Sequence, residues 1–339
     1  MADRGGDVKR IAVAGLGLIG SRHAAAVLAH PGATLAAVIE PDAALRGRYD
    51  APGFGALGDV DVPLDGVILA TPSGLHADHA CAALARGWPC IVEKPLAADL
   101  AGADRIVAAQ KNTGLAVLTG HHRRHHACVQ ALRAMVRGGA IGRPVMATCL
   151  WAMRKPDPYF TTWRQGSEGS PVMLNMVHDI DILRFVLGDV AQVQALGGAD
   201  LRGVGRVESG ILSLRFRCGA VASLAFADTT PSPWGFEAGT GENPNIATTG
   251  QDMLFTTGTT GAVSFPSLTL WRGVADWSEA PFAERQAATK TDALAAQLTH
   301  FIAVLDGRES PLIDAADARE TLAVALAAET ALIAQLVAA

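Results

Sequence analysis

Up to about residue 120, short unbroken apolar runs alternate with alanine-rich stretches. Unbroken apolar runs are typical of strands covered on both faces of a parallel sheet, because a strand with one wet face alternates apolar and polar residues. We therefore expect helices between strands at 11–14, 35–39, 67–70, 90–92 and 116–118. This alternation predicts an α/β fold with a doubly wound parallel sheet.

Local start and stop signals position three of these helices. One is expected from about residue 21 to 29, because Pro31 and Gly32 prevent it from continuing. A second follows Gly74. A third begins near Asp99, whose carboxylate is suited to an N-cap.

The pattern changes after about residue 123. At 212–216 apolar and polar residues alternate, a turn follows at 218–219, and a return strand is expected at 220–226. Such alternation predicts antiparallel sheet with one face that is wet or part of an interface.

Longer segments complete the second half of the chain. Helices are expected at 172–187, at 294–305 and from about 314 to near the end. A long loop is expected at 229–250, and such loops are often functional. We expect one domain at 1–122 and a second, α+β domain at 123–339, with the option that the last helix packs back on the first domain.

Composition argues against several classes of protein. The chain has 339 residues, of which 50% are hydrophobic and 18% charged, and a net charge of −5. We expect no nucleic-acid partner, because Lys and Arg form no cluster beyond the short run at 121–126. We expect no membrane span, which needs about 20 apolar residues, and Asp3 and Asp7 make the start a poor signal peptide.

Cysteine usage points to a reducing compartment. The five cysteines are odd in number and form no CxxC pair. This favours a cytoplasmic protein over a disulfide framework or a zinc site.

A glycine motif follows the first expected strand. Gly15, Gly17 and Gly20 have the GxGxxG spacing of a dinucleotide-binding turn, in which they permit the tight turn, the approach of the phosphates and close helix–strand packing. Leu18 and Ile19 would then open a helix whose N-terminus attracts the pyrophosphate. The motif predicts a bound dinucleotide.

Glu40 bears on which dinucleotide is bound. It stands at the end of the second expected strand, where a carboxylate accepts hydrogen bonds from the ribose hydroxyls and repels a 2′-phosphate. We therefore favour NAD over NADP, while Arg46 and Arg48 leave NADP open.

Two residues are candidates for the chemistry. Lys94 follows the fourth expected strand, and open α/β sheets bind ligands beyond the carboxyl ends of their strands. His178 lies on the expected helix 172–187, on one face with Asn175 and Asp179, and its ordinary pKa suits proton transfer near neutral pH. Each has a plainer interpretation, a surface lysine and a core or surface histidine.

These motifs make nearly the whole chain resemble the glucose–fructose oxidoreductase, inositol dehydrogenase and MocA (GFO/IDH/MocA) family. The resemblance rests on Glu93-Lys94-Pro95, on Thr71-Pro72 with His76, and on the helix of His178. It implies that residues 1–122 form a dinucleotide-binding Rossmann domain. It also implies that residues 123–339 form a substrate-binding and oligomerisation domain with a large, mostly antiparallel sheet. It further implies NAD(P)-dependent oxidation of sugars, cyclitols or related polyols, and homodimers or homotetramers formed through the open sheet.

The resemblance also implies roles for single residues. Glu93, Thr71-Pro72 and His76 would lie at the cofactor, Lys94 would contact the reacting hydroxyl and the nicotinamide ribose, and His178 would be the catalytic histidine.

The chain departs from the family pattern at one position. Leu174 occupies the place of an aspartate that many members have four residues before the histidine. Asn175, next to it, can orient a hydroxyl but cannot act as a base. Asp179 could serve only if the helix turns it inward, and we expect a solvated carboxylate.

Further polar side chains are expected at the substrate. Arg123 and Arg124 follow the fifth strand, and Tyr159, Trp163 and Arg164 precede the histidine helix. Arginine favours carboxylate or phosphate partners, so a sugar acid is a possible substrate, although each arginine could equally form a surface ion pair. We expect no metal site in the histidine-rich run at 121–126, which lacks matching carboxylate or cysteine spacing.

The predicted chemistry is hydride transfer between the nicotinamide and a secondary hydroxyl, with His178 removing the hydroxyl proton and Lys94 stabilising the alkoxide. Two alternatives stay open at this point. One is a transcriptional regulator that binds NAD without turnover, and the other is an NAD-dependent glycoside hydrolase of the same fold.

Overall fold

The computed structural model describes residues 7–160, 169–203, 205–287 and 291–336. The chain forms two compact units, Met1–His125 with Asp292–Leu322, and His126–Thr291 with Ala323–Ala339. Helix α9 (Ala315–Leu336) therefore contributes residues to both units.

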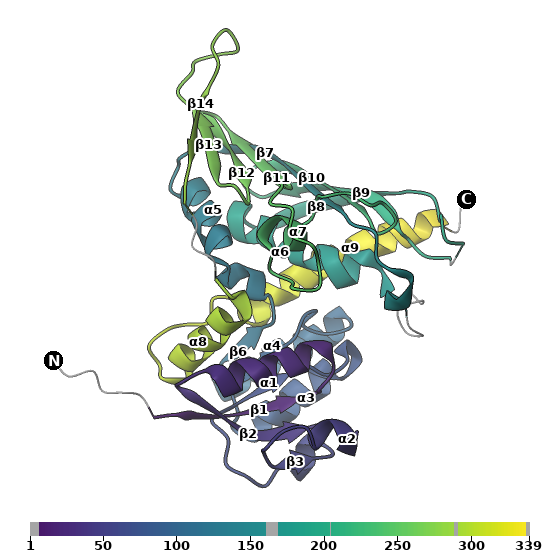
Figure 1. Ribbon diagram of the computed structural model, residues 1–339, viewed down its shortest axis with the longest axis vertical. Coiled ribbons are helices and arrows are strands. Elements are labelled where there is room, and N and C mark those ends of the chain that lie inside the picture. The colour runs from purple at the N-terminus through teal and green to yellow at the C-terminus, as the bar shows by residue number, and fades with distance from the viewer. Residues whose placement is uncertain (1–6, 161–168, 204, 288–290, 337–339) are drawn as a thin grey trace, which may run out of the picture. The chain divides into compact units, whose positions relative to one another are not determined.

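The first unit is built on a six-stranded parallel sheet with the order β3-β2-β1-β4-β5-β6 (Figure 1). Its strands are β1 (Lys9–Ala14), β2 (Ala33–Ile39), β3 (Gly53–Phe54), β4 (Gly66–Leu69), β5 (Cys90–Val92) and β6 (Val117–Thr119). The five predicted strands and the parallel sheet are confirmed. Only the two-residue β3 was not predicted.

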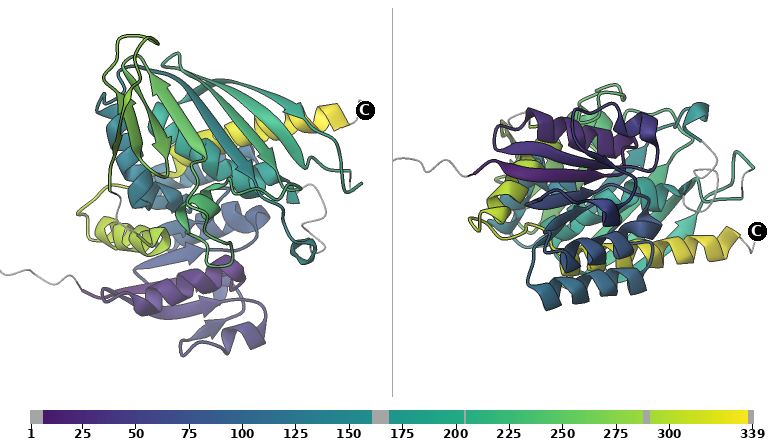
Figure 2. Two further views of the ribbon diagram at one scale, coloured as in Figure 1. Left: turned by 45° about the horizontal axis from the view of Figure 1, so that its top comes forward. Right: turned by 90° about the horizontal axis from the view of Figure 1, so that it is seen from below.

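Helices cover both faces of this sheet (Figures 1 and 2). Helices α1 (Leu18–Ala29) and α8 (Ala293–Leu305) pack on one face, around a core that includes Val13, Val27 and Phe301. Helices α3 (His76–Ala85) and α4 (Leu100–Thr113) lie on the other, and short α2 (Ala43–Arg46) follows β2. The predicted N-cap is confirmed, because the Asp99 carboxylate accepts from the Gly102 amide at 2.7 Å.

The second unit is built on an eight-stranded sheet with the order β14-β13-β12-β11-β7-β10-β9-β8. All pairs are antiparallel except β7 with β10. The strands are β7 (Pro144–Ala152), β8 (Val190–Gly197), β9 (Ser209–Phe216), β10 (Val221–Ala227), β11 (Leu254–Gly258), β12 (Gly261–Phe265), β13 (Thr269–Arg272) and β14 (Phe282–Arg285). The predicted mostly antiparallel sheet is confirmed.

Helices lie on one face of this second sheet, and its other face is open (Figure 1). They are α5 (Ala127–Arg137), α6 (Val177–Leu187), the short α7 (Phe236–Thr240) and the second half of α9. The alternation within β9 follows this asymmetry, since Leu212 and Leu214 are buried while Ile211 is 46% exposed.

Two expected segments differ from the structure. The expected helix 172–187 begins with a π-helical turn, Val172–Met176, before α6 starts at Val177. The expected loop 229–250 contains α7, because Phe236 and its neighbours find a buried position against Phe265.

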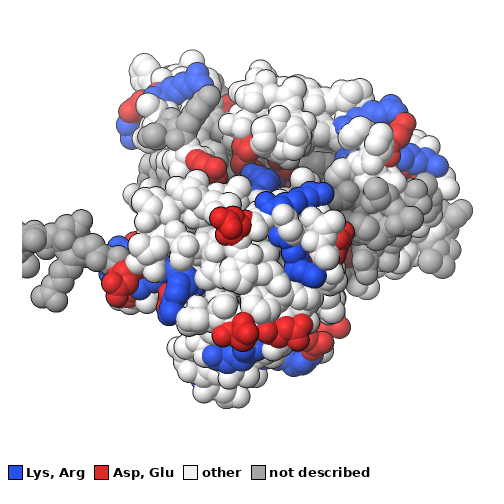
Figure 3. All heavy atoms as spheres, turned by 60° about the horizontal axis from the view of Figure 1, so that its bottom comes forward, with Lys and Arg blue, Asp and Glu red and all other residues white. Residues whose placement is uncertain are grey.

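Charged side chains of both signs are mixed over the surface drawn in Figure 3, where Lys and Arg gather mostly beside Asp and Glu. Ion pairs such as Arg10–Asp65 and Arg308–Asp306, each at 2.8 Å, join side chains of opposite charge in the first unit. No helix within the described residues is both long and apolar enough to cross a bilayer.

Candidate functional site

The three motif glycines meet different steric demands. Gly15 has φ +84°, and a Cβ on it would lie 2.5 Å from the Ala70 carbonyl oxygen. A Cβ on Gly20 would lie 1.8 Å from the Gly15 carbonyl oxygen. A Cβ on Gly17, the exposed N-cap residue of α1, would have no described atom within 4 Å. The turn is therefore closed on its inner side and open at Gly17, where the first amides of α1 face outward.

Glu40 is fixed beside this turn at the end of β2. Its Oε2 accepts from the Leu16 amide at 2.8 Å and its Oε1 from the Asp42 amide at 3.2 Å. The Arg46 guanidinium donates to the carbonyl oxygens of Glu40 and Pro41. A carboxylate has about four acceptor positions, so half-buried Glu40 has capacity left for ribose hydroxyls.

Glu93 is buried at the end of β5 and binds inside the protein. Its Oε1 lies 2.8 Å from Nε2 of buried His23 on α1, and its Oε2 accepts from the Lys94 amide at 3.0 Å. Burial alone would raise the pKa of Glu93, but the hydrogen bond and charge of His23, with the charges of His122 and Lys94, lower it to about 2. The carboxylate is therefore ionised at neutral pH, and Lys94 itself is half-buried.

His76, the first residue of α3, is also buried. Its Nδ1 lies 2.8 Å from the Pro95 carbonyl oxygen and its Nε2 lies 2.8 Å from the Thr71 carbonyl oxygen. Burial lowers the pKa of His76, against the opposing effect of both carbonyls and of Glu93. The Thr71 hydroxyl lies 3.1 Å from His79 Nδ1, and Pro72 is exposed next to it.

The parallel sheet explains why these residues are neighbours. The glycine turn, Glu40, Thr71-Pro72 and Glu93-Lys94 follow β1, β2, β4 and β5, whose carboxyl ends lie at one edge. The structure thus brings together the predicted cofactor residues and Lys94 within the first unit. It also shows what the sequence could not, that Glu93 and His76 direct their polar atoms to other parts of the protein.

Arg124 is buried after β6 and forms an ion pair within the first unit. Its Nη1 lies 2.5 Å from Asp317 Oδ2, in the first turn of α9, and 3.4 Å from the Leu312 carbonyl oxygen. The sequence suggested a substrate-side arginine or a surface ion pair, and the ion pair found here has a buried guanidinium.

The second unit contains the histidine helix. Ser170 fixes its start, because its hydroxyl accepts from the Val172 amide at 3.1 Å and donates to Glu329 on α9 at 2.6 Å. His178 is 6% exposed, and Asn175 lies half-buried in the π-helical turn. Such turns are frequent at functional sites.

The prediction that Asp179 is solvated is wrong. The residue is 1% exposed, because every residue of α6 is buried, including those that look polar in sequence. Burying a carboxylate costs free energy unless other groups stabilise it. Asp179 is therefore a stronger candidate for a specific role beside His178 than its sequence position suggested.

Of the residues expected in the substrate loop, Tyr159 is half-buried in a short 3₁₀ turn, with Lys155 Nζ 5.1 Å from its ring centre. Trp163 and Arg164 lie outside the described residues. Sequence reasoning missed Lys155 and the buried carboxylate Asp228, which are 3.7 Å apart. Both residues follow apolar strands closely in the sequence, and a charged residue at such a place could have indicated a buried charge. Among the described residues, no group of three or more His, Cys, Asp or Glu is placed to hold a metal ion.

Comparison with known proteins places the chain. Residues 9–121 match the oxidoreductase family model with an NAD-binding Rossmann fold, and residues 129–262 match the GFO/IDH/MocA C-terminal domain. The chain belongs to the GFO/IDH/MocA family. The predicted family and its NAD-binding Rossmann domain are confirmed.

Relatives within the family include sugar and cyclitol enzymes. The chain is 37% identical over 187 residues to 1,5-anhydro-D-fructose reductase of Ensifer adhaerens, covering 53% of this chain and 55% of that protein. It is 29% identical over 197 residues to inositol 2-dehydrogenase of Mycolicibacterium gilvum, covering 55% of each. The chain thus spans about half the length of the curated relatives it matches.

A solved structure shares the fold over almost the full length. The WlbA dehydrogenase of Bordetella pertussis, in complex with NADH and UDP-GlcNAcA, matches with a TM-score of 0.79 and 22% identity over 97% of each chain. At this identity the likeness concerns the fold alone.

Proposed function

We propose that this protein is an NAD(P)-dependent dehydrogenase, with NAD preferred, that acts on a secondary hydroxyl of a sugar, cyclitol or sugar acid. The observation that carries the proposal is the shared sheet edge, because Lys94 follows β5 at the same edge at which the glycine turn follows β1 and Glu40 follows β2. The names of the matched relatives support the substrate class.

The residues at this edge fit a dinucleotide. The exposed N-terminus of α1 at Gly17 offers its first amides to a pyrophosphate, and Glu40 offers acceptors to a ribose. When bound, NAD supplies the hydride acceptor, a chemistry that belongs to the cofactor.

The chain's own residues handle the substrate proton and charge. In this proposal the Lys94 ammonium stabilises negative charge on the substrate oxygen, and His178 accepts the hydroxyl proton. Leu174 stands where many family members have an aspartate, so the proposal gives that position no role in proton transfer.

The test compares Lys94→Ala with Lys111→Ala, an exposed lysine on α4. A panel of polyols and sugar acids is followed by NADH absorbance, and unfolding of each variant by urea. We expect Lys94→Ala to lose kcat by at least about 100-fold, with an unfolding midpoint close to that of Lys111→Ala. Unchanged turnover in Lys94→Ala refutes the mechanism. Binding of NAD without reduction across the panel would favour the regulator, and release of free sugar without NADH the hydrolase.

The preference for NAD rests on Glu40 and Arg46. The Glu40 carboxylate opposes a 2′-phosphate, and Arg46 already donates to two backbone carbonyls. We expect kcat/KM to be higher with NAD than with NADP, and we expect Glu40→Ala to reduce the ratio of kcat/KM with NAD to kcat/KM with NADP. A wild-type preference for NADP contradicts this role of Glu40.

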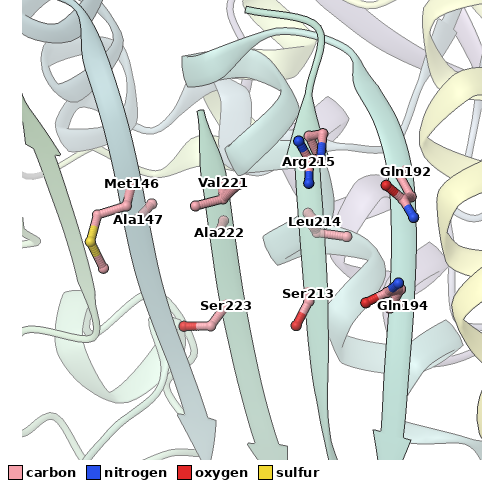
Figure 4. Close-up of a pocket in the computed structure, with 10 residues that line it drawn as sticks. All are labelled: Met146, Ala147, Gln192, Gln194, Ser213, Leu214, Arg215, Val221, Ala222 and Ser223. Atoms are coloured by element: carbon pink, nitrogen blue, oxygen red, sulfur yellow. The ribbon is translucent and has the colours of Figure 1, made fainter. Parts of the chain in front are cut away.

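We also infer that two copies associate through the open face of the eight-stranded sheet. Met146, Val221 and Ile211 are each more than 40% exposed there. Figure 4 shows that polar side chains such as Ser213 lie on this face together with apolar Met146 and Val221, and such a mixed, partly apolar face suits packing of a second sheet. Ile211→Glu should yield monomers in light scattering, whereas Lys111→Ala should not. A wild-type protein that is monomeric at micromolar concentration excludes this interface.

A further inference from the structure

The backbone around Lys94 is held on both sides by buried side chains. On one side Glu93 accepts from the Lys94 amide and lies 2.8 Å from His23. On the other side the Pro95 carbonyl oxygen lies 2.8 Å from Nδ1 of His76. Between these fixed points the side chain of Lys94 is half-exposed.

His76 links two neighbouring loops. Strands β4 and β5 pair in register, with Leu69 opposite Val92, and the ring of His76 bridges the loops that follow them, through the carbonyls of Thr71 and Pro95. The side chain has 1% of its surface exposed. A ring so enclosed, with both nitrogens facing backbone oxygens, has no polar atom left for a cofactor.

Both partners of the ring are acceptors. A neutral imidazole has one N–H, so it donates to one carbonyl, and only the cation donates to both. The bond to Pro95 is the one that acts next to Lys94, whereas the bond to Thr71 acts on the preceding loop. The two bonds can therefore be separated by substitution.

We propose that His76 is a positioning residue for Lys94, which fixes the lysine backbone by donating from Nδ1 to the Pro95 carbonyl. It acts on the chemical step through the placement of the ammonium, rather than by touching the cofactor. The inference rests on the proposed catalytic role of Lys94, and it assigns His76 a role other than the cofactor contact that the family resemblance implies.

Two amide substitutions test the proposal. In His76→Asn the new side-chain amide occupies the place of Nδ1 and keeps a donor for Pro95, and His76→Gln keeps one at the place of Nε2 for Thr71. We expect His76→Asn to retain kcat within a few-fold, and His76→Gln to lose about 10- to 100-fold in kcat with KM for NAD unchanged. Equal losses in both variants, or a change in KM for NAD instead of kcat, overturn the proposal.

A second measurement does not depend on turnover. The chain contains few lysines, so reductive ¹³C-methylation gives a simple NMR spectrum in which Lys94→Ala identifies the Lys94 signal; the lysines are Lys9, Lys94, Lys111, Lys155 and Lys290. We expect the Lys94 signal to shift in His76→Gln and to keep its position in His76→Asn. If Lys94→Ala leaves turnover unchanged while these shifts occur, the proposed function fails and the positioning role stands. An unmoved signal in both variants refutes the positioning role.

Discussion

The glycine turn permits a matched test of fold against function, because Gly20 and Gly17 stand in the same motif with opposite surroundings. A methyl group on Gly20 would lie 1.8 Å from the Gly15 carbonyl oxygen and 3.3 Å from the Ala70 side chain. A methyl group on Gly17 would meet no described atom within 4 Å. Gly20→Ala should therefore damage the fold, and Gly17→Ala the binding of the cofactor.

The magnitudes follow from these contacts. Alanine in a helix usually gains about 1 kcal/mol over glycine, but forcing extra atoms into a packed site costs about 1–3 kcal/mol, and sometimes more. The obstacle at Gly20 is a backbone oxygen, which no side-chain rotation can remove. We expect a net loss of about 2 kcal/mol in the free energy of unfolding for Gly20→Ala. Gly17 has φ −66°, which alanine adopts easily, so Gly17→Ala should cost less than about 1 kcal/mol.

Cofactor binding should show the reverse order. A methyl group on Gly17 would fill open space at the N-terminus of α1, where the second motif glycine lets the backbone approach the pyrophosphate. Loss of one charge-assisted hydrogen bond costs about 1.5–3 kcal/mol, so Kd for NAD should rise about 10- to 100-fold. The assays are urea unfolding without cofactor, followed by tryptophan fluorescence, and calorimetric titration with NAD. A Gly20→Ala protein as stable as wild type, or a Gly17→Ala protein that binds NAD normally, refutes the reasoning.

Three further predictions concern buried or capping carboxylates. The pKa of Glu93 is lowered to about 2, below its unfolded value near 4.5, so its contribution to the free energy of unfolding is complete above pH 4.5 and is lost as pH falls toward 2. Urea unfolding measured across this pH range should show a loss of about 3 kcal/mol from this group, and the loss should be absent in Glu93→Gln. Asp99→Ala should lower the free energy of unfolding by about 1 kcal/mol in urea, through loss of the α4 N-cap. Burial raises the pKa of Glu329, so its contribution to the free energy of unfolding falls as the pH rises through that raised pKa. Thermal unfolding at a series of pH values should show this fall in stability in the wild type and a flatter curve in Glu329→Gln.

The N-terminal fold was predictable because each strand is covered on both faces. An unbroken apolar run such as 67–70 indicates a strand buried on both faces, and this can be predicted without knowing which strands pair with it. The cap at Asp99 was predictable for the same reason, since it depends on residues within one turn. The two-residue strand β3 was too short to leave any pattern.

The second sheet was harder to predict, because its strands are defined by distant partners. Strand β7 pairs with β10 and β11, which are far along the chain, and apolar residues such as Val145 and Met146 are exposed on it, so its sequence shows no clear alternation. A sequence pattern records only which side of a strand is wet. It does not record that β7 and β10 run parallel within an otherwise antiparallel sheet.

The surroundings of site residues were predictable to different degrees for the same physical reason. The tight turn at the motif glycines and the position of Lys94 after β5 depend on neighbours within a few residues. The ion pair of Arg124 depends on Asp317 in a helix at the other end of the chain. The burial of Asp179 depends on everything that surrounds α6. Neither partner is visible in a local pattern.

The structure also separates what each motif gives to the fold from what it gives to function. Gly15 and Gly20 are required by packing alone, and buried Glu93 links α1 to the loop after β5 by binding His23 and the Lys94 amide. A chain that had lost its cofactor would still need these residues to keep this sheet edge. Gly17 and Lys94 are not enclosed in this way, since Gly17 is exposed and Lys94 only half-buried. Substitutions at these two positions, rather than the motif as a whole, are therefore what should distinguish a family member that binds and turns over its cofactor from one that merely keeps the fold.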